Sequence, residues 1–456
     1  NDQLLGSQND MATIRLVNND ARLVIENIKE ADELGGLMAS HVKVVGVLHD
    51  DNGRINGVKA KDLLTDEEFE IKAKMVINTT GPWVTKTLGL DDKNGEGEVI
   101  RPTKGVHLVV DSSRLRVPQP TYFDSGIGDG RMIFVVPREN KTYFGTTDTD
   151  YTGDYKHPRV EQADVDYLLK AINNRYPEAE ITINDIEASW AGLRPLLSGN
   201  GSSDYNGGGS NTGKVSDESF ENLIKTAVAY SKDEASRGEV EKSISSLKTA
   251  SAEKTLSPSQ VSRGSSLKVG DDGLITLSGG KITDYRKMAA GAMELIRKLF
   301  KELFNKDVRE VDSKKLQVSG GHFDPTNVDE TMKFYQKIAM DKGMPAADAA
   351  DLANRFGSNT SRVISYADDV EAAPGLTLAD TLSLHYSVNE EMTLNLVDFL
   401  LRRTNYILFH KDELMMKKDA FVDEMARIME WNEEEKAAAA KQLDETIAES
   451  SLAYLK

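Results

Sequence analysis

Residues 273–300 read GLITLSGGKITDYRKMAAGAMELIRKLF, which predicts a strand, a glycine turn and a helix in direct succession. The turn is Gly279-Gly280-Lys281-Ile282-Thr283. Paired glycines let a backbone approach a planar or anionic ligand closely, because no Cβ stands in the way. The first N–H groups of the helix would then face that ligand with the positive end of the helix dipole, and Lys281 adds a full charge. An ordinary strand-to-helix turn with a solvated lysine would carry the same letters.

Composition limits the classes of protein to which the chain can belong. Its 456 residues predict two to four domains at about 150 residues each. The 74 acidic residues exceed the 56 basic ones, so the net charge of −18 is expected to repel nucleic acid and anionic membranes. The absence of cysteine excludes disulfides, thiolate metal sites and cysteine nucleophiles. No run of about 18 apolar residues predicts a transmembrane helix, and a cytoplasmic location is the simplest expectation.

Upstream of the turn, the chain is predicted to be mostly β. A first helix is expected over 20–34, with Asp20 as its N-cap and an apolar face of Leu23, Val24, Ile28 and Ala31. Strands follow, the first two joined at 51–53, and the strand 75–78 leads into Gly81-Pro82. Residues 101–150 read as further strands. Within them, 126–130 resembles a phosphate loop, but its place between two strands predicts a hairpin turn.

Two regions change character. Residues 199–220 are dominated by glycine, serine, asparagine and aspartate, and we interpret 199–258 as a mobile surface insertion. After about residue 312 the pattern is helical to the end of the chain. Asn432 followed by Glu435 predicts a capped start for the last helix.

Three further residues could carry chemistry. Arg194, in SWAGLRPLLSG, and Arg263, in VSRGSS, offer guanidinium forks that could hold a phosphate; the alternative is that each pairs with a buried acid. His107, in RPTKGVHLVVD with Lys104 close by, is either a packed core residue or a general base. The other histidines show no paired spacing that suggests a metal site; they are His41, His49, His157, His322, His385 and His410.

Six segments, in consistent order, resemble the FAD-dependent glycerol-3-phosphate dehydrogenases and oxidases. They are NTTGPWV at 78–84, RPTKGVHLVVD at 101–111, YFGTTDTDY at 143–151, WAGLRPL at 190–196, SRGSS at 262–266 and GGKITDYRKMA at 279–289. The stretch at 379–404 is similar to that family's helical cap. The insertion resembles the oxidase branch, the alpha-glycerophosphate oxidases, because the dehydrogenases join the flanking segments by a shorter connection.

The resemblance implies a role for each candidate residue. Arg194 and Arg263 would bind the substrate phosphate, His107 would be the catalytic base, and Lys281 would lie near both the substrate and the flavin pyrimidine edge. The cofactor would be FAD, contacted by Val42, Gly81, Pro82, Trp83, Gly279, Gly280, Lys281, Ile282 and Thr283. The implied reaction oxidises sn-glycerol 3-phosphate to dihydroxyacetone phosphate and reduces dioxygen to hydrogen peroxide. A quinone-linked dehydrogenase and a non-catalytic fragment that does not hold FAD are the alternatives.

The implied fold mixes α+β and α/β, as in FAD-dependent oxidoreductases of the glutathione-reductase-like and amino-acid-oxidase-like type. We expect an FAD-binding remainder over 1–100, a β-rich substrate domain over 101–198, the insertion over 199–258, a return to the FAD and substrate domains over 259–311, and a helical domain over 312–456. The family opens with a strand, a GxGxxG turn and a helix, and nothing before residue 20 fits that pattern. We therefore expect an incomplete FAD domain. Peripheral membrane contact and homo-oligomer formation stay open.

Overall fold

The computed structural model describes residues 19–91, 99–198, 224–226, 228–232 and 264–456. The predictions for Arg263 and for most of the insertion 199–258 lie outside these ranges. The strands are β1 (Val42–His49), β2 (Ile55–Asp62), β3 (Glu68–Lys72), β4 (Ile77–Asn78), β5 (Val99–Asp111), β6 (Thr121–Asp124), β7 (Met132–Arg138), β8 (Lys141–Gly145), β9 (Thr149–Asp150), β10 (Ile186–Ser198), β11 (Ser265–Val269) and β12 (Ile275–Gly279). The helices of four or more residues are α2 (Asp20–Glu33), α3 (Val84–Leu88), α4 (Gln162–Arg175), α7 (Tyr285–Phe304), α8 (Val328–Asp341), α9 (Ala346–Phe356), α10 (Thr360–Ser365), α11 (Leu378–Glu390), α12 (Tyr406–Phe409), α13 (Lys411–Met429) and α14 (Glu433–Ser450), and a π-helical segment spans Asp398–Arg403.

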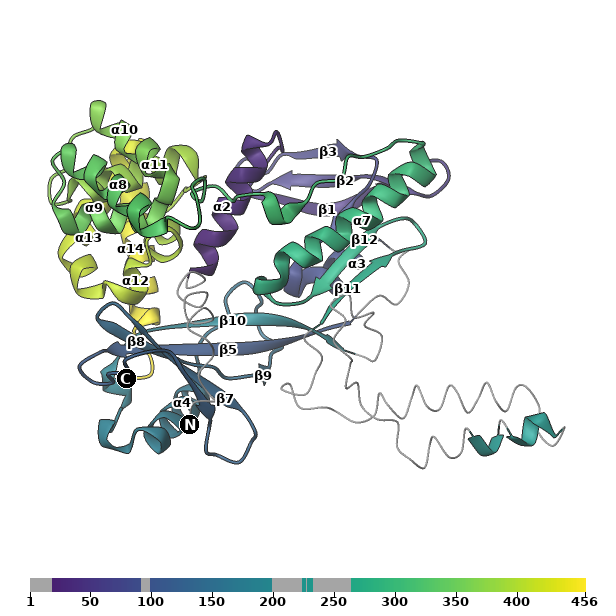
Figure 1. Cartoon of the computed structure of the whole chain (residues 1–456), viewed down its shortest axis with the longest axis horizontal. Coiled ribbons are helices and arrows are strands. Elements are labelled where there is room, and N and C mark those ends of the chain that lie inside the picture. Colours follow the sequence, from purple (N-terminus) through teal and green to yellow (C-terminus); the bar gives the residue numbers. More distant parts are fainter. Residues whose placement is uncertain (1–18, 92–98, 199–223, 227, 233–263) are drawn as a thin grey trace.

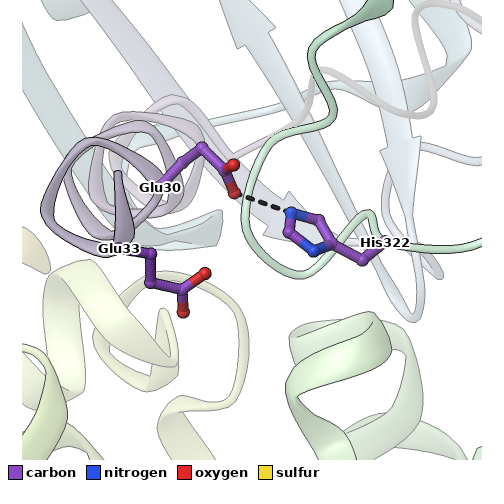
Figure 2. A group of neighbouring side chains, drawn as sticks. All are labelled: Glu30, Glu33 and His322. Carbon is purple, nitrogen blue, oxygen red and sulfur yellow. Dashed lines mark hydrogen bonds and ion pairs between the residues drawn. The ribbon is translucent and has the colours of Figure 1, made fainter. Parts of the chain in front are cut away.

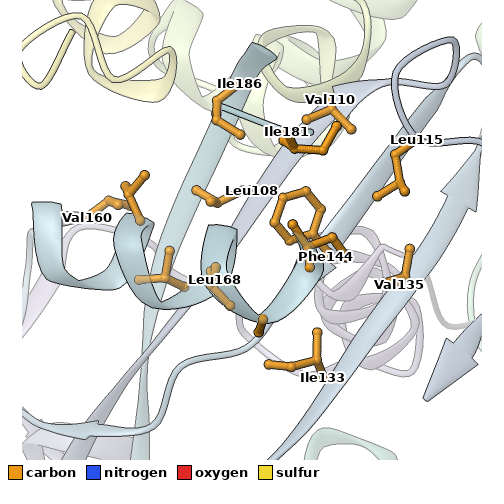
Figure 3. Packing of buried hydrophobic residues seen from close by; sticks show 14 of the residues in the cluster. Leu108, Val110, Leu115, Ile133, Val135, Phe144, Val160, Leu168, Ile181 and Ile186 are labelled. Atoms are coloured by element: carbon orange, nitrogen blue, oxygen red, sulfur yellow. The ribbon is translucent and has the colours of Figure 1, made fainter. Parts of the chain in front are cut away.

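The long strands β5 and β10 form the centre of a six-stranded sheet, in the order β10-β5-β8-β7-β6 with β9 beside β5. Helix α4 covers one face of this sheet, and the apolar core between them includes Val106, Leu108, Val110, Phe144 and Leu168 (Figure 3). Successive side chains of a strand point to opposite faces. The even-numbered residues of β5 therefore build the core, and the odd-numbered residues face away from α4.

Two smaller sheets are drawn above β5 and β10 in Figure 1, on either side of α7. One is the antiparallel meander β1-β2-β3, and the other has the order β11-β12-β4. In the second sheet β12 pairs with β4 in parallel, with Ile275 opposite Ile77 and Thr276 opposite Asn78. Segments about 200 residues apart in the chain are thus neighbours in one sheet.

The predicted turns are confirmed. Strands β1 and β2 pair antiparallel around the turn at 51–53, where Gly53 has a φ of 78°. The segment 126–130 joins the antiparallel strands β6 and β7, so it is a hairpin turn, as expected.

The prediction for the first helix was right in extent but wrong in its buried face. Its N-cap is Asn19, whose side chain accepts a hydrogen bond from the Arg22 N–H at 2.9 Å, whereas Asp20 is the first helical residue. Val24 and Ile28 are exposed, and the buried positions of α2 are charged instead. Ion pairs with the helical part of the chain compensate the burial of these charges, and hydrophobic periodicity gives no signal for such pairs.

The C-terminal part is helical, as predicted, and α8 to α14 pack around two apolar clusters (Figure 1). Asn432 caps α14 by accepting hydrogen bonds from the Glu434 and Glu435 N–H groups, and Glu435 closes the capping box. The chain end then returns to the large sheet, where Leu452 joins the core beneath α4. Among the described helices, none combines the length and apolar character needed to cross a bilayer.

Candidate active site

The face of the large sheet that points away from α4 carries three cross-strand pairs between β5 and β10. Directly opposed residues of antiparallel strands project to the same face. The pairs are Thr103 with Arg194, Gly105 with Gly192, and His107 with Trp190. A Cβ at Gly192 would meet no atom within 4 Å, so the space above Gly192 is open. The face therefore has a glycine floor between an arginine and a histidine.

Arg194 lies across this floor. A Cβ at Gly105 would stand 2.5 Å from both terminal nitrogens of Arg194, so only glycine admits the guanidinium here. Its Nη2 donates to Thr146 Oγ1 at 2.9 Å and its Nη1 to the Thr147 carbonyl at 3.2 Å, with Asp148 Oδ1 3.5 Å from Nη1. The expected alternative, a buried acidic partner, is thus present. The side chain still keeps 27% of its surface accessible, which leaves room for an anion.

His107 is held flat beside the same floor. Its imidazole stacks on Trp190 with 4.7 Å between ring centroids and 11° between planes, and Tyr143 meets it edge-on at 6.2 Å. A Cβ at Gly145 of β8 would lie 2.5 Å from His107 Cδ2, so this glycine makes room for the ring. Nδ1 is enclosed and has no hydrogen-bond partner among the described residues. Packing against these rings therefore fixes the orientation of the imidazole, while its Nδ1 forms no hydrogen bond within the described residues.

Its protonation state follows from this environment. Burial first, and the charge of Arg194 second, lower the pKa of His107 to about 3. The side chain as a whole retains some exposure, whereas Nδ1 is fully enclosed. Because the enclosed Nδ1 is removed from water, the charged form is disfavoured and the imidazole is neutral at neutral pH.

Two loops that are far apart in sequence meet at the ends of β4 and β12. Strand β4 leads through Asn78 into the short 3₁₀ turn Gly81–Trp83, and β12 ends at Gly279 in the glycine turn. Because β4 and β12 are parallel, their carboxyl ends lie at the same edge of the sheet. Ligands of open α/β sheets bind outside the carboxyl ends of the parallel strands. The predicted pairing of the two loops around one ligand is compatible with this arrangement.

The backbone of both loops suits the close approach of a flat ligand. Gly81 has a φ of 56° and Gly279 and Gly280 have φ values of 72° and 82°, so all three adopt the left-handed conformation that glycine favours. A Cβ at Gly81 would meet nothing within 4 Å, which shows open space beside this turn. At Gly279 and Gly280 the Cβ position is taken up by the Gly264 carbonyl oxygen and by Met288, so the open approach for a planar cofactor lies on the Gly81 side of this edge.

This edge also touches the large sheet near Arg194. A Cβ at Gly279 would lie 3.1 Å from Leu197 Cγ, and Leu197 packs with Val84 and Ile100 in a small apolar cluster. Leu197 follows Arg194 by three residues on β10. Leu197 pairs with Ile100 and Arg194 with Thr103, so these two side chains of β10 project to opposite faces of the sheet. The glycine turn and the Gly81 loop thus meet the end of β10, three residues along the strand from Arg194.

One expectation about the glycine turn needs correction, namely the point at which the helix begins. The turn is followed by a 3₁₀ helix, Ile282–Asp284, and α7 begins only at Tyr285, so the α-helical N-terminus lies four residues beyond Lys281. Lys281 itself is exposed.

Lys104, which is close to His107 in the sequence, lies on the opposite face of β5, where it contacts Glu161 and Asp164 at 2.7 Å each. The reason is the two-residue period of the strand, which sends neighbours to opposite faces.

The remaining predicted residues are more scattered. Trp83 packs edge-on against Tyr155 at 6.3 Å, beside the Gly81 turn. Val42 begins β1 in the separate meander sheet, opposite Asp62, so its contact with the adenine side stays a prediction. The roles of Thr146 and Trp190 were missed, although both lie in segments that the family resemblance includes. Trp190 lies beside His107 because β10 pairs with β5 in the register that places these two residues opposite each other. The sequence alone does not give this register.

Comparisons with known proteins agree with this geometry. A family model described as FAD dependent oxidoreductase matches residues 15–211, and one described as the C-terminal domain of alpha-glycerophosphate oxidase matches residues 311–436. The alpha-glycerophosphate oxidase of Streptococcus pneumoniae is 56% identical over 439 residues, which cover 96% of this chain and 72% of the relative. The same enzyme of Lactococcus lactis is 53% identical over 439 residues, with the same two coverages.

A solved structure supports the fold as well. The glycerol-3-phosphate dehydrogenase from Bacillus halodurans, complexed with FAD, superposes with a TM-score of 0.75 at 32% identity, covering 95% of this chain and 73% of that one. The mixed fold with a C-terminal helical domain is therefore confirmed. Together with the relatives at more than 50% identity, these findings show that the chain belongs to the alpha-glycerophosphate oxidase family of FAD-dependent oxidoreductases.

Proposed function

We propose that this chain oxidises sn-glycerol 3-phosphate with FAD as cofactor. The products are dihydroxyacetone phosphate and, from the dioxygen that takes up the two electrons and two protons, hydrogen peroxide. One observation carries the proposal: Arg194 and His107 flank a glycine floor on β5 and β10, and the end of β10 at Leu197 meets the glycine-bearing loops at the carboxyl ends of the parallel strands β4 and β12. The names of the relatives supply the substrate class.

Arg194 is assigned to the phosphate group. Its guanidinium lies over Gly105. Gly105 and His107 are two residues apart on β5, which corresponds to about 6.6 Å along the strand. A three-carbon phosphate is of the right length to reach from the arginine to the histidine. Arg263, which lies outside the described residues, is assigned the second phosphate contact on the basis of the family resemblance.

His107 is assigned to the proton of the C2 hydroxyl. Because Nδ1 is enclosed, Nε2 is the nitrogen that accepts this proton. A phosphate dianion on Arg194 offsets the guanidinium charge, which is the second cause of the low pKa of His107. Substrate binding therefore raises the basicity of the imidazole at the moment when a base is needed.

The loops at the sheet edge are assigned to the cofactor. Gly81, Pro82 and Trp83 would hold one side of the flavin, and the turn from Gly279 to Thr283, with Lys281, the other; Val42 would contact the adenine part. FAD, when bound, supplies a two-electron acceptor beside the substrate carbon. The pairing of β4 with β12 supports a single FAD-binding domain built from 1–100 and 259–311. Residues 101–198 then form the substrate domain, 199–258 the insertion and 312–456 the helical domain.

An oxygen-electrode experiment tests the proposal. Purified chain supplied with FAD and sn-glycerol 3-phosphate should consume dioxygen and form one hydrogen peroxide per dioxygen. Glycerol should give no turnover at the same concentration, because it lacks the phosphate group that Arg194 is proposed to bind. Turnover that requires a quinone and forms no peroxide would instead assign the chain to the dehydrogenase reaction. A chain that retains no FAD and shows no turnover would be the non-catalytic fragment.

A further inference from the structure

Three segments that are distant in sequence bring a histidine and two carboxylates together at the end of the small sheets far from the glycine turn. His49 ends β1, Asp91 follows α3, and Asp272 lies in the turn between β11 and β12. One ligand atom from each of the three lies within 4.8 Å of the other two, and His49 Nε2 is 2.9 Å from Asp91 Oδ2. Spacing along the chain could not reveal this group, which explains why no metal site was expected from the sequence.

Burial distinguishes this group from an ordinary surface cluster. Asp91 is 8% exposed and Asp272 is 6% exposed. Asp272 Oδ1 accepts a hydrogen bond from the Leu274 N–H at 3.0 Å, but the enclosed Oδ2 has no hydrogen-bond partner among the described residues. Arg54 lies close to Gly273, yet in the described part of the chain it forms no ion pair with Asp272. A buried carboxylate oxygen without a partner is costly, so a cation that fills this place would be strongly favoured.

We propose that His49, Asp91 and Asp272 bind one divalent transition-metal ion of the Zn²⁺ or Mn²⁺ class. One imidazole nitrogen with two carboxylate oxygens suits these ions, whereas Ca²⁺ and Mg²⁺ prefer oxygen alone. The His49 side chain keeps 18% of its surface accessible, which leaves an entry path and room for a water ligand. The competing explanation is a simple hydrogen bond between His49 and Asp91, and it leaves Asp272 Oδ2 without a partner.

The position of the site gives the ion a structural role. Asp91 lies just beyond α3, which the Gly81 turn begins, and Asp272 stands just before β12, which ends at the glycine turn. An ion bound there would join the far ends of both elements to the end of β1. Metal binding should therefore raise the thermal unfolding midpoint without any need for FAD or substrate.

A second group provides a matched control. Glu30, Glu33 and His322 also offer three ligand atoms within 4.8 Å of one another (Figure 2). Here His322 Nε2 contacts Glu30 Oε2 at 2.7 Å, but Glu33 is exposed and lies 3.8 Å from an Arg362 nitrogen. No enclosed atom without a partner belongs to this group among the described residues. We expect it to remain without a tightly bound ion.

The test is a metal titration of the full chain after chelator treatment and dialysis, with bound metal counted by mass spectrometry and the unfolding midpoint followed in parallel. The wild type should bind one equivalent of Zn²⁺ or Mn²⁺ and not Mg²⁺, and its midpoint should rise. Asp272→Asn and His49→Gln should each weaken binding by about 10–100-fold or more, since even indirect partners of a metal contribute that much. His322→Gln should bind like the wild type. A wild type that binds no equivalent, or one whose binding depends on His322 instead, would overturn the proposal.

Discussion

Arg194 keeps 27% of its side-chain surface accessible beside Asp148, and the absence of a side chain at Gly105 makes room for its guanidinium. Replacing Arg194 with alanine should raise KM for sn-glycerol 3-phosphate by about 10- to 100-fold, because a hydrogen bond to a charged group contributes about 1.5–3 kcal/mol. Arg194→Lys should recover only part of this loss, because lysine lacks the planar fork. Steady-state kinetics measures both variants. Arg114→Gln is the control, because Arg114 pairs with Asp185 on the surface; an unchanged KM in Arg194→Ala would remove this residue from the phosphate site.

His107 makes a second prediction, for the rate. His107→Gln should lower the rate of substrate oxidation by about 10²–10⁴-fold with little change in KM, since it removes the proton acceptor and leaves the phosphate contact in place. Stopped-flow absorbance of the flavin would measure this rate. Oxidation at the wild-type rate would show that the histidine serves packing alone.

The same residue predicts a pH dependence of stability. The pKa of His107 falls from 6.5 in the unfolded chain to about 3 in the folded one, so below pH 6.5 the unfolded state binds the proton first. The contribution of His107 is therefore complete above pH 6.5 and is lost as the pH falls toward 3, by at most about 1.4 kcal/mol per pH unit. Urea unfolding across this range should show a shallower decline for His107→Gln than for the wild type. Parallel declines would contradict the low pKa.

At the scale of elements, the end of β12 depends on the backbone of Gly279. Its φ of 72° is left-handed, and a Cβ would lie 2.5 Å from the Gly264 carbonyl oxygen. Gly343 has a φ of 90° with nothing within 4 Å of the Cβ position. Gly343→Ala should therefore cost only the conformational strain, about 1–2 kcal/mol. Gly279→Ala should cost more and should also weaken FAD binding. Chemical denaturation and flavin fluorescence titration separate the two effects, and equal losses in both variants would show that the contact with Gly264 is unimportant.

Local patterns predicted most of these elements correctly. The turns at 51–53 and 126–130, the strands 101–150 and the capped last helix follow from short-range rules, and the structure has them. Long-range pairing was beyond the reach of such rules. Parallel pairing of β4 with β12, the stacking of Trp190 on His107 and the charged buried face of α2 all depend on partners far away in the chain. The family resemblance supplied the candidate site residues, but strand register decided which of them share a face.

At the scale of the whole molecule, α2 is joined to the helical part of the chain by a buried ion cluster. Glu391 has no exposed side-chain surface and pairs with Arg22, and it accepts a hydrogen bond from Lys29 Nζ at 3.1 Å. Lys29 also donates to Tyr386 Oη at 2.6 Å. Burial alone would raise the pKa of Glu391, but the charges and hydrogen bonds of Arg22 and then Lys29 hold it below its ordinary value of 4.5. The carboxylate is therefore ionised in the folded protein and faces three cations at once, because Arg403 Nε also lies 3.6 Å from its Oε2.

Neutralising this carboxylate should loosen the junction between α2 and the helices. Glu391→Gln removes the fully buried carboxylate and leaves Glu26 as the remaining acidic partner of Arg22 and Lys29, so it should cost at most about 3–5 kcal/mol of unfolding free energy. The neighbouring Glu390 pairs with the exposed Arg362 at 2.6 Å, so Glu390→Gln should cost at most about 1 kcal/mol. Because the pKa of Glu391 is depressed, its contribution is present above pH 4.5 and is lost as the pH falls below it. Denaturation at pH 7 and at several values below pH 4.5 measures both effects: the two variants should differ most at pH 7, and the difference should shrink by at most about 1.4 kcal/mol per pH unit below 4.5. Equal losses at pH 7 would show that the cluster does not hold the two parts together.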